Sequence, residues 1–87
     1  MNLGKVVGHL WASAKHESLI GAKLLIVAGI DFEGKPLGTY EVAYDTVDAG
    51  PGDIVLTVKG SSAKMMPETG SATIDCAIVG VVDHVEQ

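Results

Sequence analysis

The most informative absence in this sequence is arginine. All six basic residues are lysines, and the eleven acidic residues bring the formal net charge to −5. Nucleic-acid binding needs clustered positive charge, and arginine is the side chain that most often reads base edges. Anionic membrane surfaces likewise attract clustered basic residues. The composition therefore argues against a nucleic-acid partner and against binding to an anionic membrane.

Cysteine and long apolar runs are also scarce. Cys76 is the single cysteine, so no disulfide can form within the chain and a reducing compartment is expected. The longest apolar run, Leu24–Ile30, is far shorter than a membrane-spanning helix. The first residues do not resemble a secretory signal. These features predict a cytoplasmic protein without a membrane span.

Aromatic residues make up only 5% of the chain, whereas hydrophobic residues make up 47%. The core must then consist mainly of Val, Ile, Leu and Ala, and β-branched side chains suit a pleated sheet. Eleven glycines among 87 residues indicate many turns rather than long helices. The composition predicts a single all-β domain over residues 1–87.

Alternating hydrophobicity between glycine-rich and proline-rich turns predicts about five strands. Their expected ranges are Lys5–Ala12, Ala22–Phe32, Leu37–Val47, Ile54–Lys59 and Ala77–Val85. One short helical turn is expected over Ser61–Met66, ended by Pro67. This pattern favours a small five-stranded OB-like β-barrel with one short helix, because closing a sheet removes its exposed edges.

The alternation within each strand predicts which side chains point inward. In the third strand it predicts one dry and one wet face, made by Tyr40, Val42 and Tyr44 against Glu41, Ala43 and Asp45. In the fourth strand the residues expected inward are Ile54, Leu56 and Val58. The second strand is apolar on both faces, which predicts burial in a barrel or under a neighbouring subunit. This excess of apolar surface indicates an oligomer.

Motifs that would support catalysis or ligand binding are weak. Gly29–Pro36 resembles the phosphate loop GxxxxGK[ST], but Pro36 has no hydroxyl, and Asp31 and Glu33 would repel a phosphate. A turn between two strands is therefore predicted there. Trp11 is interpreted either as a core anchor or as an interface anchor, because tryptophan is favoured in both places.

The cysteine and histidines do not form a recognisable site. Zinc ligands usually occur in closely spaced pairs, and no such spacing is present among His9, His16, His84 and Cys76. A catalytic thiol needs a base and a polarised environment, so Cys76 is predicted to be a buried structural thiol. No metal or cofactor site is expected from these residues.

Two longer stretches, Ala43–Lys64 and Thr73–Asp83, carry a resemblance to a known family. They contain the patterns VDAGxGDxVL, GSSA and DxAIVGVVD, and Gly4–Gly8 and Leu19–Leu25 fit as well. The combination is more specific than any one piece. Over nearly its whole length, the chain resembles the EutN/CcmL family of bacterial microcompartment vertex proteins.

The resemblance implies an OB-like barrel that assembles as a homo-pentamer at the five-fold corners of a polyhedral shell. It implies a structural protein with no enzymatic activity and no cofactor, located in a cytoplasmic microcompartment shell. The implied partners are copies of the chain itself and the hexagonal proteins of the shell facets. A ring of this kind uses a heterologous interface, in which each subunit offers two different patches.

The resemblance also places Gly60, Ser61, Ser62 and Ala63 at or near the subunit interface. Small residues allow backbones to approach, and hydroxyls can satisfy backbone groups. The next residue is Lys64, where the family usually has arginine, so the planar bidentate fork of arginine is absent. A strand end followed by a helix with capping serines is the simpler interpretation of the same residues.

Two other functions remain open from the residues alone. An OB-like barrel can bind a small ligand or single-stranded nucleic acid, although the acidic charge and the few aromatic residues oppose the nucleic-acid version. A small enzyme using Cys76 or a histidine is the second alternative, but the sequence suggests no reaction for it.

Overall fold

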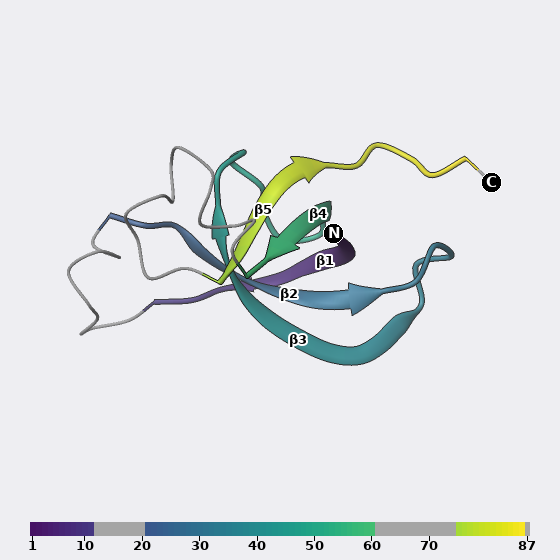
Figure 1. Cartoon of the computed structure of the whole chain (residues 1–87), viewed down its shortest axis with the longest axis horizontal. Coiled ribbons are helices and arrows are strands. Elements are labelled where there is room, and N and C mark those ends of the chain that lie inside the picture. Colours follow the sequence, from purple (N-terminus) through teal and green to yellow (C-terminus); the bar gives the residue numbers. More distant parts are fainter. Residues whose placement is uncertain (12–20, 61–74, 87) are drawn as a thin grey trace.

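The computed structural model describes residues 1–11, 21–60 and 75–86, and these residues form a five-stranded barrel (Figure 1). The strands are β1 (Asn2–His9), β2 (Leu24–Ile30), β3 (Pro36–Asp45), β4 (Ile54–Lys59) and β5 (Cys76–Val81). The described residues contain no helix, and hence no helix that is long and apolar enough to span a membrane. The helical turn expected over 61–66 lies outside these residues.

The strands close the barrel in the order β1-β2-β3-β5-β4. Neighbouring strands are antiparallel, except that β3 and β5 run parallel at Tyr44–Ala77 and Asp45–Ile78. Each predicted strand corresponds to one observed strand. The predicted all-β, OB-like barrel is therefore confirmed.

The predicted and observed strand ends differ at both ends of the chain. β1 begins at Asn2 rather than at Lys5, because Asn2 and Leu3 pair with β4. β5 ends at Val81 rather than at Val85. Val82 still donates its backbone N–H to the carbonyl of Ile54 at 2.8 Å. The valine-rich sequence therefore extends further along the chain than the paired strand does.

The barrel interior holds mainly aliphatic side chains. Its buried cluster consists of Val6, Leu25, Val27, Ala43, Ala49, Val55, Cys76 and Ile78. Gly4 of β1 is buried against β2, and a Cβ built on Gly4 would overlap the Val27 side chain. β1 can therefore approach β2 at this point only if no side chain is present.

The inward and outward faces of β3 and β4 are not those that hydrophobicity predicts. In β4, Val55 and Thr57 are buried, whereas the predicted inward set of Ile54, Leu56 and Val58 is only partly covered. In β3, the dry face carries Ala43 and Asp45, while Tyr40 and Val42 are exposed. In these two strands the smaller residues point inward, and the larger apolar residues lie on the outside.

The turn between β2 and β3 is confirmed as a plain connection. Asp31 Oδ1 accepts hydrogen bonds from the backbone N–H of Glu33 at 2.8 Å and of Lys35 at 2.9 Å. Gly34 has φ of 85°, a conformation that glycine adopts without steric cost. The carboxylate at residue 31 occupies the donors that a phosphate would need. The loop therefore closes on itself rather than around an anion.

A buried carboxylate fixes the bend that follows β3. Asp45 accepts hydrogen bonds from the backbone N–H of Val47 at 3.0 Å and of Ala49 at 2.9 Å, and its side chain is fully buried. Lys23 pairs with Asp45 at 3.1 Å and with Asp48 at 2.9 Å. Lys23 also donates to the carbonyl of Ala49 at 2.7 Å. One lysine head group therefore ties the start of β2 to the bend.

We predict that folding stability is constant from neutral pH to about pH 9 and falls above it. Burial raises the pKa of the Cys76 thiol above 9.0, so the unfolded chain loses this proton first and gains stability relative to the fold. Hydrogen bonds to Asp48 and Asp45 raise the pKa of Lys23 above 10.5. The stabilisation from Lys23 is full below that pH and is lost as the pH rises through the folded-state pKa.

Urea unfolding at fixed subunit concentration, repeated from pH 7 to pH 11, checks this expectation. The variant Cys76→Ala should be less stable at every pH, but it should lack the part of the decline that starts near pH 9. A wild-type free energy of unfolding that stays unchanged up to pH 11 would contradict both pKa shifts.

Candidate subunit interface

Apolar side chains lie on the outer face of β2 and β3, where a single chain leaves them uncovered. Tyr40 lies opposite Ala28 in the ladder, and Val42 lies opposite Ile26. Tyr40 is 70% exposed and Val42 is 44% exposed. A soluble monomer normally carries polar residues at such outward positions of an antiparallel sheet. This face therefore has the character of a contact surface.

A second apolar region covers the outer face on the other side of the barrel. Leu56 of β4 is paired with Leu3 of β1 and with Gly80 of β5. Both leucines are only partly covered in the single chain. The structure thus presents apolar residues on two different sides, which is the arrangement that a heterologous contact needs. The excess apolar surface expected from the sequence is present, and it lies outside the barrel.

The structure describes one of the five residues predicted at the interface. Gly60 follows β4 with φ of 63°, and its N–H donates to the carbonyl of Asp75 at 2.8 Å. This bond joins the end of β4 to the residue before β5. Ser61, Ser62, Ala63 and Lys64 lie outside the described residues. Their role at an interface stays a prediction.

Trp11 lies on the surface, so its interpretation as a core anchor is wrong. It is 82% exposed and stacks on the ring of His9, with ring centroids 4.3 Å apart and the planes at 1°. Cys76 is buried, as predicted, and His84 is exposed. His16 lies outside the described residues. Within the described ranges, no three His, Cys, Asp or Glu side chains come together as a metal site would require.

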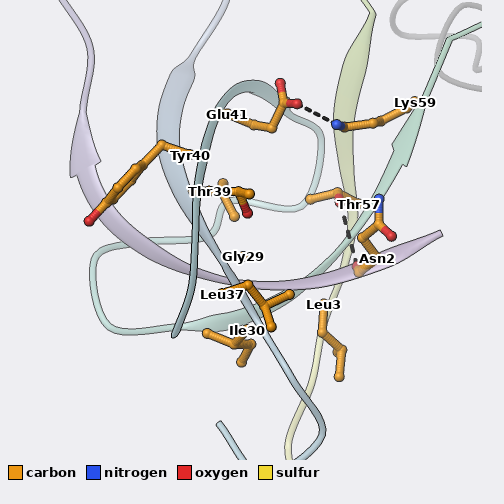
Figure 2. Close-up of a pocket in the computed structure, with 11 residues that line it drawn as sticks. Asn2, Leu3, Gly29, Ile30, Leu37, Thr39, Tyr40, Glu41, Thr57 and Lys59 are labelled. Carbon is orange, nitrogen blue, oxygen red and sulfur yellow. Dashed lines mark hydrogen bonds and ion pairs between the residues drawn. The ribbon is translucent and has the colours of Figure 1, made fainter. Parts of the chain in front are cut away.

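A hollow of about 480 Å³ opens in the barrel wall between β3 and β4 (Figure 2). Glu41 of β3 and Lys59 of β4 form an ion pair across the opening. Thr39 and Thr57 line the wall with their hydroxyls, and Gly29 leaves room for Thr39, whose Oγ1 would overlap a Cβ at residue 29. The Tyr40 ring points away from the other labelled side chains.

The chemistry of this hollow is unsuited to nucleophilic catalysis. The ion pair with Glu41 raises the pKa of Lys59 above 10.5, so its amine stays protonated and cannot attack a substrate. The described lining residues include neither histidine nor cysteine. This pair could not be predicted from the sequence, because Glu41 and Lys59 lie on strands that meet only in the folded barrel. The ion pair links β3 and β4, which are not neighbours in the barrel order.

Comparison with known proteins places this barrel among shell proteins. The model of the family "Ethanolamine utilisation protein EutN/carboxysome" matches residues 1–83. The bacterial microcompartment shell vertex protein GrpN of Rhodospirillum rubrum is 46% identical over 86 residues, covering 99% of this chain and 97% of GrpN. The carboxysome shell vertex protein CcmL of Synechocystis is 41% identical, covering 98% of this chain and 85% of CcmL.

The solved structures agree with the sequence comparison. The pentameric microcompartment shell protein GrpN from Rhodospirillum rubrum superposes with a TM-score of 0.91 at 46% identity, covering 100% of this chain and 99% of that one. The match extends over the barrel strands and is not confined to a short motif. The chain therefore belongs to the EutN/CcmL family.

Proposed function

We propose that this chain is a structural subunit of a bacterial microcompartment shell, and that five copies form a ring at a shell vertex. The observation that carries the proposal is the near full-length match to a pentameric shell protein at 46% identity. The apolar outer faces supply the surface that self-association would bury. Relatives that are named as shell vertex proteins favour this function over a ligand-binding module or an enzyme.

The partners follow from how a shell closes. A flat layer of hexagonal tiles has no curvature, so a closed polyhedron needs five-fold units at its corners. The proposed ring would contact copies of the chain on two sides and hexagonal shell proteins around its rim. The shell lies in the cytoplasm, so the ring would function there. No cofactor is needed for this role, because the work is done by shape and packing.

The stretch Gly60–Lys64 is proposed to lie at the contact between subunits. Gly60 follows β4 with a positive φ, a conformation that glycine adopts without steric cost. Small residues immediately after such a turn would let a neighbouring backbone approach closely. Lys64 would place a cation there without the bidentate geometry of arginine.

Native mass spectrometry over a range of subunit concentrations tests the assembly. The purified chain is expected to give a five-subunit species that persists on dilution. A monomer that remains at high concentration would contradict the proposed ring. Another defined stoichiometry would contradict the vertex role while leaving self-association in place.

The substitution Ser62→Trp tests the position of the interface. It is expected to shift the native mass to species smaller than the ring, because an indole cannot fit where two backbones approach closely. Ser62→Ala removes only the hydroxyl and is the matched control, which should retain the ring. Circular dichroism should show the same β content in both variants. A stable ring in Ser62→Trp would remove this stretch from the interface.

A further inference from the structure

One flank of β3 lacks a strand partner over part of its length. β3 pairs with β2 from Pro36 to Tyr44, but it pairs with β5 only at Tyr44 and Asp45. In the stretch before Tyr44, no described strand pairs with this flank. Among the described strands, β3 is therefore an edge strand before Tyr44, although its pairing with β5 closes the barrel at Tyr44 and Asp45.

The direction of the free backbone groups follows from the ladder. The N–H of Asp45 donates to the carbonyl of Lys23, on the β2 side. Successive residues of a strand point their backbone groups to alternate sides, so those of Val42 and Tyr40 point away from β2. The ladder has no register shift between Tyr44 and Tyr40. Both residues thus present an N–H and a C=O toward the open flank.

An open flank of this kind invites another strand. Unpaired edge groups form a template for pairing with a second chain. Addition of an extended segment to such an edge is a common mode of recognition, in which backbone bonds provide affinity and alternate side chains provide specificity. The exposed side chains of Tyr40 and Val42 flank this template. The hollow between β3 and β4 leaves space beside it.

The chain also contains a segment that pairs in a ladder with none of the described strands. After β5, residues 82–86 continue past the end of that strand (Figure 1), and residues 82–85 line a hollow with residues 30–34 at the β2–β3 turn. Val82 is tied to β4 through the carbonyl of Ile54, and Val85 is 42% exposed. β5 lies between β4 and β3 in the barrel order. This segment therefore leaves on the β4 side and is directed away from the open flank of its own chain.

The segment and the flank are complementary in length. Five extended residues span roughly 16 Å at about 3.3 Å each, which is enough to cover both Tyr40 and Val42. Charge does not decide the pairing, because the segment carries Asp83 and Glu86 while Lys59 beside the opening is already paired with Glu41 of β3. The two surfaces lie at different places on the subunit, as a heterologous ring contact requires.

We propose that residues 82–86 of a second copy add as a strand to the open flank of β3, pairing with Tyr40 and Val42. The inference rests on the proposed function, because it needs a neighbouring copy in the ring. Each subunit then gives its segment to one neighbour and receives a segment from the other. Ring formation would in this way cover the edge that the single barrel leaves open.

Cysteine cross-linking in the full chain tests the pairing directly. Four double variants combine Tyr40→Cys or Val42→Cys with His84→Cys or Val85→Cys. After mild oxidation, a non-reducing denaturing gel should show covalent species larger than dimers. The single variants can give dimers at most, because Cys76 is buried. The pair Val7→Cys with Val85→Cys is the matched control, because Val7 is also exposed but lies on β1, and it should give no larger species.

Native mass spectrometry of the same samples distinguishes a failure of the strand pairing from a failure of the proposed function. Five-subunit rings that yield no covalent species above dimers in any of the four variants would overturn the strand pairing and leave the proposed function standing. Disulfides confined within single chains would overturn it too, because the flank would then be covered by its own chain. Absence of any oligomer would overturn both.

Hydrogen exchange on the unsubstituted protein provides a readout that does not depend on cysteine geometry. In the ring, the amides of Tyr40 and Val42 should exchange at least about tenfold more slowly than in the dissociated Ser62→Trp variant. The reason is that their N–H groups form hydrogen bonds in the ring. Exchange at the same rate in both states would overturn the pairing.

Discussion

Replacing Asp45 with alanine is expected to lower the free energy of unfolding by about 3 kcal/mol, because a buried charge network loses its centre. The substitution leaves the N–H groups of Val47 and Ala49 without their acceptor. It also removes one of the two carboxylates that pair with Lys23. For a domain of this size, that loss is a large fraction of a total stability of roughly 4–13 kcal/mol.

Equilibrium unfolding in urea at fixed subunit concentration measures this effect, since assembly contributes to apparent stability. Asp45→Asn is the matched control for size. Its single carbonyl oxygen can accept from one N–H, while its amide group faces the other donor, so it should lose nearly as much stability as the alanine variant. Lys23→Met should be milder than Asp45→Ala, because Asp45 would keep both backbone bonds. A loss below about 1 kcal/mol for Asp45→Ala would show that water replaces the carboxylate at this bend.

Replacing Gly4 with alanine is expected to destabilise the barrel by about 2–3 kcal/mol, near the upper end for overpacking a core. The added Cβ would overlap the Val27 side chain and lie 3.1 Å from the carbonyl oxygen of Ala28. Val27 is only 4% exposed, so it has little space into which to move. The clash must then separate β1 from β2, which are paired at this position.

Gly8→Ala is the matched control on the same strand. Its Cβ would meet the Cδ1 atom of Ile26 at 3.4 Å, which is the end of a flexible and partly exposed side chain. The expected change is within about 1 kcal/mol, since glycine in a strand is itself mildly unfavourable. Thermal melting and urea unfolding of both variants give the comparison. Equal effects at the two positions would mean that close strand approach does not explain Gly4.

The two apolar outer faces explain why the hydrophobic pattern misleads inside a small barrel. In β3 and β4 both sets of alternate residues include apolar side chains, so alternation alone does not identify the inner set. The interior takes Ala43 and Val55, and the larger Tyr40 and Leu56 are left for contacts outside. Hydrophobicity in an assembling protein reports burial in the oligomer as well as burial in the single chain.

The sequence by itself determined the strands and the turns between them. Glycine and proline punctuate the chain locally, so Glu33–Pro36 and Asp48–Asp53 mark connections without reference to the rest of the fold. The scarcity of aromatic residues and the many β-branched ones set the fold class in the same way. The motifs spread along the chain are specific enough to indicate the family.

Only the tertiary structure decided which faces point inward and which charged residues meet. Lys23 and Asp45 come together because β2 and β3 are paired, and Glu41 meets Lys59 because β3 curves away from β5. The open flank at Tyr40 and Val42 has the same origin. Strand order, register and barrel width are properties of packing between distant segments, and local sequence preferences carry no information about them.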